Sequence, residues 1–310
     1  MKNHTYALEV KGLKKRFKDK SVLNGVDFQV EKGTIFSLLG ANGAGKTTTI
    51  KILTTLLKPD EGMAYAGGYD ILKDVKKIHE QISLTGQFAA VDEALSGYEN
   101  LVMMGNLYHI KDPKIQALKL LNYFSLDSSK DKRVSTYSGG MRRKLDIAMS
   151  LVHKPSIIFL DEPTTGLDPQ SRRAMWDIVK NLKKSGVTIF LTTQYLEEAE
   201  ALADHIAILH EGKIKLEGTP QELKMTLPKH VLELQLNDQK AFNKTWDILS
   251  HYTKQSNEES FTISITFTDT VNDVIDILQS IKQADIPLQD LHLKQTTIED
   301  VYMKMMEETL

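Results

Sequence analysis

A phosphate-binding pattern is the first feature of the sequence that could carry chemistry. Residues Gly40-Ala41-Asn42-Gly43-Ala44-Gly45-Lys46-Thr47, with Thr48 directly after them, match G-x-x-x-x-G-K-[ST] between a short apolar run and a helical pattern. The glycines allow consecutive backbone N–H groups to turn towards a phosphate at a helix N-terminus, where anions are favoured. Lys46 is expected to reach the β- and γ-phosphates of a nucleotide, and the Thr47 hydroxyl to bind Mg²⁺.

Two adjacent carboxylates follow another apolar run far down the chain. Ile157–Leu160 is typical of a buried strand, and Asp161 and Glu162 come directly after it. A buried parallel strand delivers the residues at its carboxyl end to the ligand edge of an α/β sheet. Asp161 is therefore predicted to hold Mg²⁺ through water, and Glu162 to act as the general base. An apolar strand ending in acids is by itself more often a solvated turn, so this hypothesis depends on its pairing with the loop at 40–47.

A second candidate anion site is the run Tyr137-Ser138-Gly139-Gly140-Met141-Arg142-Arg143-Lys144, at the head of an amphipathic helical pattern. Ser138 is a typical N-cap, and the glycines leave backbone N–H groups accessible at a helix start. One nucleotide cannot use this cradle while the first cradle holds it. Two chains arranged head to tail would solve the problem, because each second cradle would face the phosphates bound by the other chain. An ordinary capped helix explains the motif equally well when it is taken alone.

The elements that must position these residues alternate between strands and helices. Apolar runs predict strands at 7–10, 26–30, 35–39, 82–85, 157–160, 188–191 and 206–209, and helical patterns cover 47–57, 115–124 and 170–183. A capping box at Ser96 and Glu99 predicts a further helix to about Tyr108. This alternation predicts an α/β fold, with a mostly parallel sheet core, an antiparallel β edge and an inserted helical subdomain over about 88–151.

The composition changes near residue 219. Glycine is scattered through 1–218 and is absent from 219 onwards. The alternating segment Phe261–Phe267 predicts a half-buried antiparallel strand, and helical patterns cover 242–252, 271–281 and 298–306. We therefore predict a first domain over 1–224 and a separate small α+β domain over 225–310.

The overall composition limits the function classes. The 310 residues include 39 Lys and Arg, 41 Asp and Glu and no Cys, with a formal net charge of −2. The lack of a basic excess argues against nucleic acid as a partner, and the lack of Cys excludes disulfides and cysteine nucleophiles. No apolar stretch approaches the roughly 20 residues that cross a bilayer, and the N-terminus lacks a signal-peptide pattern. We expect a cytosolic protein whose membrane role depends on a partner.

With the three motifs in this order, the sequence resembles the ATP-binding subunit of ATP-binding-cassette (ABC) transporters over roughly 5–225. The resemblance implies ATP and Mg²⁺ as ligands and a P-loop NTPase ABC cassette as the fold. It implies that Gln87 contacts Mg²⁺ and the attacking water, and that Gly166-Leu167-Asp168 cross the dimer interface. Phe17 stands where an aromatic ring usually stacks on adenine, although strand packing also explains it. Residues 88–110 would carry the groove for the coupling helix of a transmembrane permease.

The sequence departs from the common family pattern in two motifs. Tyr137 and Met141 flank an intact Ser-Gly-Gly core where Leu and Gln are common, and Gln194 replaces a histidine that contacts the γ-phosphate. A glutamine can donate and accept hydrogen bonds but cannot become cationic, so the resemblance implies a catalytic contact with an altered hydrolysis rate. An exposed loop residue is the other interpretation of Gln194. The runs YSGGMRRKLDIA and TTQYLEEAE, with the tail segment 297–303, are similar to the daunorubicin-resistance type of bacterial drug-export ATPase.

The resemblance implies that a pair of ATP-binding subunits, identical or closely homologous, energises a separate permease at the cytoplasmic face of the cell membrane. The expected cargo is a drug, antibiotic or other amphipathic compound. A second hypothesis, an ABC ATPase of DNA repair or of the ribosome, is opposed by the short segment between Gln87 and Tyr137, the single cassette and the near-neutral charge. Drug sensing or signalling with a permease is a third hypothesis that the sequence leaves open.

Overall fold

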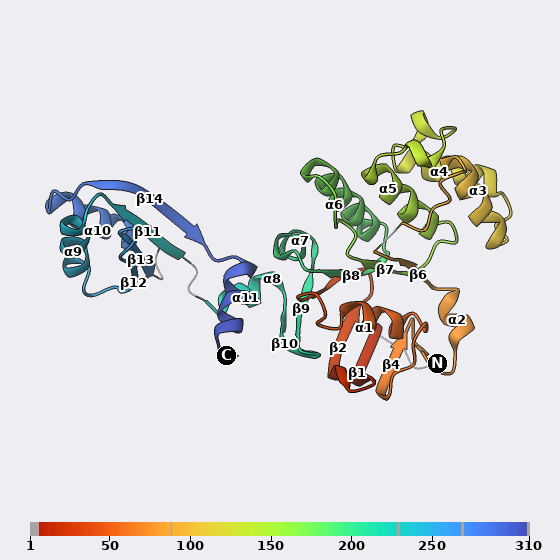
Figure 1. Ribbon diagram of the computed structural model, residues 1–310, viewed down its shortest axis with the longest axis horizontal. Helices are drawn as coiled ribbons and strands as arrows, with labels where there is room; N and C mark the ends of the chain where they lie inside the picture. The colour runs from red at the N-terminus through yellow and green to blue at the C-terminus, as the bar shows by residue number, and fades with distance from the viewer. Residues whose placement is uncertain (1–5, 88, 228–229, 268–269, 309–310) are drawn as a thin grey trace. The chain divides into compact units, whose positions relative to one another are not determined.

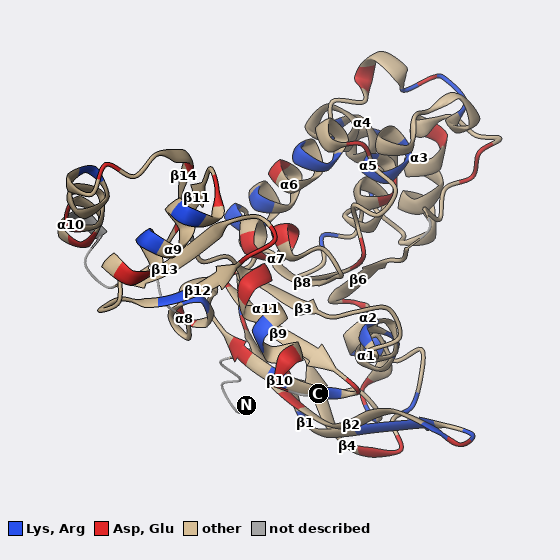
Figure 2. Ribbon diagram, turned by 60° about the vertical axis from the view of Figure 1, so that its left-hand side comes forward, with Lys and Arg blue, Asp and Glu red and all other residues tan. Residues whose placement is uncertain are grey.

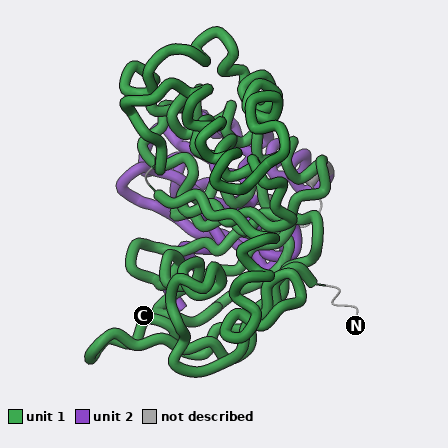
Figure 3. The backbone as a smooth tube through the Cα atoms, turned by 90° about the vertical axis from the view of Figure 1, so that its right-hand side faces the viewer, with its two compact units in different colours: residues 1–219 green, residues 220–310 purple. Residues whose placement is uncertain are grey.

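The computed structural model describes residues 6–87, 89–227, 230–267 and 270–308 (Figure 1). The chain divides into two compact units, residues 1–219 and 220–310 (Figure 3). The boundary expected after residue 224 falls inside helix α8 (Pro220–Met225), which packs against α11 (Ile298–Glu307). The division therefore precedes α8, because the packing partner of this helix belongs to the second unit.

The described residues of unit 1 form two sheets. The larger has six strands in the order β10-β9-β3-β8-β7-β6, parallel except for the β10–β9 pair, and the smaller is antiparallel in the order β2-β1-β4-β5. The mostly parallel core with an antiparallel β edge is thereby confirmed. The strands are β1 (Tyr6–Phe17), β2 (Lys20–Glu31), β3 (Ile35–Leu39), β4 (Glu61–Ala66), β5 (Tyr69–Asp70), β6 (Ile82–Thr85), β7 (Ile157–Asp161), β8 (Thr188–Thr193), β9 (His205–His210) and β10 (Lys213–Gly218).

The helices of unit 1 include an insertion, α3 to α5, between β6 and β7 (Figure 1). Phe88, at the expected start of this insertion, lies outside the described residues. The first helix ends at Leu53 rather than at residue 57, because Thr55 adopts a φ of +64°, outside the right-handed helical region. The helices are α1 (Lys46–Leu53), α2 (Val75–His79), α3 (Gly97–Leu107), α4 (Pro113–Tyr123), α5 (Gly139–Ser150), α6 (Pro169–Lys184) and α7 (Leu196–Leu202), with 3₁₀ turns at Asp127–Ser129 and Val134–Thr136.

Buried side chains cover both faces of the central sheet. Phe36, Phe159 and Phe190 point to the side of the four-stranded sheet, where Phe28 stacks on Phe36 with ring centroids 5.1 Å apart. The alternate residues of the same strands, such as Ile158, pack with α3 to α6 on the other side. This two-sided burial is the reason that these strands are continuous apolar runs in the sequence.

In unit 2, the described residues begin with α8, continue in the element order β-α-β-β-α-β and end with the helix α11. The antiparallel sheet of this unit has the order β12-β13-β11-β14, the arrangement of a split βαβ fold. Sequence patterns predicted β13 and three helices but missed the other strands, of which β12 is mostly exposed and polar and lacks an apolar alternation. The elements are β11 (His230–Leu236), α9 (Gln239–Ile248), β12 (Thr253–Asn257), β13 (Thr262–Phe267), α10 (Thr270–Gln283) and β14 (Leu288–Gln295).

Charged residues of both signs occur throughout the chain. Figure 2 shows Lys and Arg interspersed with Asp and Glu along the ribbon of both units, and their totals of 39 and 41 nearly cancel. Among the described residues, no helix is both long and apolar enough to span a bilayer.

Candidate functional site

The phosphate-binding pattern forms the turn between β3 and α1. Gly45 is the N-cap of α1 with a φ of +116°, a backbone conformation that strongly favours glycine. At Gly40, an added Cβ would lie 2.4 Å from the Leu209 carbonyl oxygen, so no larger residue fits. The Lys46 ammonium donates to the carbonyl oxygens of Gly40 at 2.8 Å and Ala41 at 3.1 Å. The loop therefore holds its lysine close to its own backbone, at the start of a helix.

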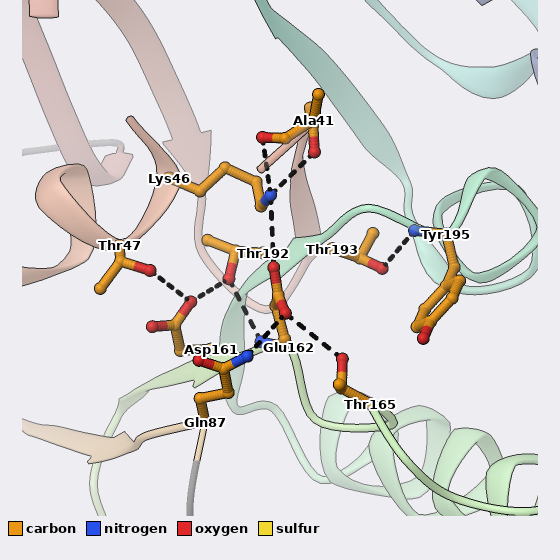
Figure 4. A network of polar contacts seen from close by, with 11 residues as sticks. Ala41, Lys46, Thr47, Gln87, Asp161, Glu162, Thr165, Thr192, Thr193 and Tyr195 are labelled. Carbon is orange, nitrogen blue, oxygen red and sulfur yellow. Dashed lines mark hydrogen bonds and ion pairs between the residues drawn. The ribbon is translucent and has the colours of Figure 1, made fainter. Parts of the chain in front are cut away.

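The carboxyl end of β7 brings the two acidic residues to this loop (Figure 4). The Lys46 Nζ lies 3.3 Å from Glu162 Oε1, and both side chains are buried, with 4% and 9% of their surfaces exposed. Asp161 Oδ1 accepts hydrogen bonds from the Thr192 hydroxyl at 2.6 Å and from the Thr47 hydroxyl at 3.4 Å. A cation, two hydroxyls and two carboxylates thus meet at one edge of the parallel sheet.

Glu162 is held in one orientation by groups from three elements. Its Oε2 accepts from Gln87 Nε2 at 3.2 Å and from the Thr165 hydroxyl at 3.3 Å, while its Oε1 faces Lys46. Its backbone has a φ of +48°, in the left-handed region that a non-glycine residue rarely adopts. The structure therefore joins Gln87, Lys46 and Glu162, three predicted site residues that are widely separated in the sequence.

A cavity of about 330 Å³ opens beside these groups. Phe17 lines it together with the phosphate loop, Gln87 and Glu162. The Phe17 ring is 46% exposed and lies below the Lys15 ammonium, 5.6 Å from the ring centroid to Nζ. Gln194 and Ser138 are not among the described residues that line this cavity. Gln194 follows β8 and is half-buried.

The oxygen donors around Asp161 fit Mg²⁺. This ion is bound in proteins through one or two carboxylates together with substrate phosphates and water, not by a complete protein cage. Thr47 and Asp161 supply a hydroxyl and a carboxylate that already lie within hydrogen-bond distance, and Gln87 supplies an amide close by. Within the described ranges, no group of three or more His, Cys, Asp or Glu side chains could hold a metal without phosphates.

The second glycine motif begins α5. Ser138 is its N-cap, and the Ser138 hydroxyl accepts from the Met141 N–H at 3.3 Å. Ser138 and Gly139 are exposed, whereas Tyr137 is 3% exposed and donates its hydroxyl to the Ser129 carbonyl at 2.7 Å. Burial raises the pKa of Tyr137. The Tyr137 side chain thus anchors the motif in the helical subdomain, while Ser138 and Gly139 remain exposed.

The loop Gly166-Leu167-Asp168 lies beside this motif in the same chain. An added Cβ on Gly140 would meet the Ser171 hydroxyl at 2.8 Å, and one on Gly139 would lie 3.9 Å from Leu167. Asp168 caps α6 by accepting from the Ser171 N–H at 2.9 Å. Two helix starts that carry predicted interface residues therefore form one surface.

The structure adds residues that sequence analysis did not assign. Thr192, the fifth residue of β8, bonds both Asp161 and the backbone of Glu162. Glu198 in α7 is fully buried and accepts from the Thr164 hydroxyl at 2.7 Å and the Trp176 indole at 3.1 Å, and burial raises its pKa. Thr192 could have been found from the sequence, because it lies in a pair of threonines at the end of an apolar strand. Glu198 could not, because nothing in the sequence distinguishes this buried glutamate from the exposed Glu197 beside it.

Comparison with known proteins agrees with this geometry. The domain family described as ABC transporter matches residues 23–165. The daunorubicin/doxorubicin resistance ATP-binding protein DrrA of Streptomyces peucetius is 48% identical over 79% of this chain and 75% of its own length. The doxorubicin resistance ATP-binding protein DrrA of Mycobacterium tuberculosis is 41% identical over 98% of this chain and 95% of its own. A solved ATP-binding subunit of an ABC transporter is 30% identical, with a TM-score of 0.64 over 71% of this chain and 92% of its own.

Proposed function

The chain belongs to the ABC transporter family as an ATP-hydrolysing subunit, and on this premise we propose that it energises a separate membrane permease which exports an amphipathic drug. The names of the two DrrA relatives, which concern resistance to daunorubicin and doxorubicin, support export over sensing. The observation that carries the enzymatic part is the contact of Lys46 with Glu162, because it joins the phosphate loop to a carboxylate that can act as a base.

Different site residues bind the nucleotide and activate the attacking water. The N–H groups of the loop from Gly40 to Thr48 and the Lys46 ammonium bind the phosphates, and Phe17 at the rim of the cavity stacks on the adenine. Glu162 takes the proton of the attacking water, with its carboxylate oriented by Gln87 and Thr165. Gln194 contributes a hydrogen bond to the γ-phosphate once ATP is bound.

Mg²⁺ would be held by Thr47, Asp161 and Gln87. When bound, the ion neutralises the charge that develops on the transferring phosphate. The Asp161 carboxylate is fixed for this role by the buried Thr192 hydroxyl at 2.6 Å.

The site is completed by a second copy or a close homologue. The run from Tyr137 to Met141 begins a helix whose exposed Ser138 and Gly139 do not line the cavity of their own chain, so they are available to the nucleotide of a partner. Gly166, Leu167 and Asp168 lie against this motif and would share the same interface.

The permease would bind in a second cavity of about 510 Å³, which supports a peripheral place at the cytoplasmic face of the membrane. It lies between β6, α3 and α5, and most of its exposed lining is apolar, as a groove for a short amphipathic helix requires. The residues are Thr54, Leu56, His79, Ile82, Ser83, Leu84, Ala90, Met104, Tyr108, Asp146, Met149 and Ser150.

The proposal is tested by doxorubicin accumulation in a drug-sensitive bacterium that expresses the chain together with its permease. The parent should lower accumulation, and Lys46→Ala should abolish the effect because the phosphates lose their cation. Lys51→Ala, an exposed lysine on the same helix, is the control and should behave as the parent. Equal accumulation with the parent and with Lys46→Ala would refute drug export by this pair.

A further inference from the structure

Arg143 lies in the second turn of α5 and is 5% exposed. Its guanidinium donates to three backbone carbonyls. Nε bonds the Pro163 oxygen at 3.0 Å, Nη1 the Gly86 oxygen at 2.5 Å and Nη2 the Asp161 oxygen at 3.2 Å. One side chain from the insertion is therefore bonded to two loops of the central sheet.

These carbonyls flank the residues that carry the chemistry. Asp161 and Pro163 precede and follow Glu162, and Gly86 precedes Gln87. The positive φ of Glu162 persists only where the surrounding structure holds the backbone in place. On one side the Glu162 N–H donates to the Thr192 carbonyl at 3.1 Å. On the other side Arg143 fixes the backbone, because its guanidinium donates to the carbonyls of the residues directly before and after Glu162.

Asp146, one turn further along α5, fixes the guanidinium. Its Oδ2 accepts from Arg143 Nη1 at 3.2 Å, and its Oδ1 accepts from the Ala90 N–H at 3.1 Å. Ala90 follows Gln87 closely, so the pair bonds the Gln87 loop on both sides of that residue. Asp146 also lines the 510 Å³ cavity assigned above to the permease.

Stability alone does not explain this buried pair. Replacing a buried ion pair by apolar residues is often neutral or stabilising, so such a pair is weak evidence for a purely structural role. The planar guanidinium, in contrast, donates to three separate carbonyls from three nitrogens in a fixed arrangement, which a lysine ammonium on a flexible stem cannot reproduce.

We propose that Arg143 is a positioning residue for ATP hydrolysis, which sets Glu162 and Gln87 through the backbone beside them, with Asp146 holding the guanidinium in place. This inference rests on the proposed roles of Glu162 and Gln87. Helix α5 then has two roles. It begins with the exposed Ser138 motif, and through Arg143 it aligns the catalytic groups of its own chain.

The test measures ATPase kinetics and ATP affinity on the full chain with its permease. Arg143→Lys should lower kcat by at least about tenfold, since misplacing a reacting group by 1 Å costs up to about 100-fold. ATP affinity should stay within about twofold, because the bonds of Arg143 go to the loops beside Glu162 and Gln87 and not to the phosphate loop. The same substitution at Arg173, an exposed arginine of α6 that belongs to none of the site motifs, is the matched control, and its kcat should not change.

A second pair of variants separates positioning from stability. Arg143→Met leaves Asp146 buried without its cation, whereas Arg143→Met/Asp146→Leu removes both charges, so the double variant should have the higher Tm. Its kcat should nevertheless stay low, because the three carbonyls remain without their donor. Recovery of both kcat and Tm in the double variant would overturn the inference. An unchanged kcat in Arg143→Lys would also overturn it, as would an equal loss of ATP affinity and kcat in Arg143→Lys. Glu162→Gln distinguishes the positioning role of Arg143 from the base role of Glu162. Normal turnover in Glu162→Gln would refute the base role.

Discussion

At the scale of single residues, the site depends on charges that are buried together. Lys46 and Glu162 form an ion pair with little exposure to water, where screening by solvent is weak. The pair brings the lysine that we propose binds phosphates within 3.3 Å of the carboxylate that we propose activates water. The hydroxyls of Thr47 and Thr192 both donate to Oδ1 of the neighbouring Asp161, the carboxylate that we propose binds a metal ion.

Glu162→Gln should retain ATP binding and lose turnover. The amide keeps the shape of the side chain but is a far poorer base, and loss of a general base costs about 10²–10⁴ in rate. Steady-state ATPase assays measure the loss, and size-exclusion chromatography should detect an ATP-bound dimer that no longer dissociates. Glu197→Gln, an exposed carboxylate on α7, is the control. A kcat for Glu162→Gln within a factor of about three of the parent would remove Glu162 from the base role.

At the scale of elements, helix N-termini determine where the motifs lie. The helices α3, α5 and α6 each begin with a side-chain cap, from Ser96, Ser138 and Asp168 respectively. Ser138 and Asp168 belong to the predicted interface motifs. The residues that begin these two helices are therefore also the ones expected to face a partner chain. The cap at Ser96 has a structural role, since the Ser96 N–H in turn donates to the Glu99 carboxylate at 2.8 Å.

Ser96→Ala should destabilise unit 1 by about 1 kcal/mol, the usual effect of losing an N-cap hydroxyl. The hydroxyl accepts from the Glu99 N–H at 3.2 Å, and Ser96 is buried, so water does not easily replace it. Urea unfolding followed by circular dichroism measures the change. Ser135→Ala, at an exposed position in the neighbouring 3₁₀ turn, should stay within about 0.5 kcal/mol of the parent. Equal midpoints for both variants would contradict the capping role.

At the scale of the whole molecule, hydrolysis is expected to need two chains. Among the described residues, the Ser138 motif is not part of the lining of the cavity beside Lys46, which supports the proposal that this motif serves the nucleotide of another chain. The head-to-tail arrangement gives each ATP a phosphate loop from one chain and a serine–glycine motif from the other.

Mixing two inactive variants tests this arrangement. Ser138→Arg should block hydrolysis but leave the ATP affinity of the monomer intact, because the residue serves the opposite chain. Lys46→Ala loses its own nucleotide. A mixed dimer contains one site with both changes and one with neither, so part of the ATPase activity should return. If Ser138→Arg instead weakens monomer ATP binding as much as Lys46→Ala does, the head-to-tail arrangement is wrong for this protein.

The sequence by itself determined the features that depend on neighbours along the chain. The phosphate loop follows a fixed spacing, the strands of the doubly covered sheet are apolar runs, and the capping box at Ser96 lies within four residues. Each of these patterns reflects a local backbone geometry, so a single stretch of sequence contains it. The strand β12 was missed for the same reason, because its exposed polar residues carry no alternation.

Only the tertiary structure decided which distant groups meet. The sheet order places Gln87 after β6 next to Glu162 after β7. The packing of α5 against α6 sets the Ser138 motif beside Ser171. Arg143 gave no signal, because its partners are backbone carbonyls and any residue type presents a carbonyl. Contacts of this kind depend on how the elements pack. Because the partners are backbone groups, the types of the residues that Arg143 contacts carry no recognisable sequence pattern.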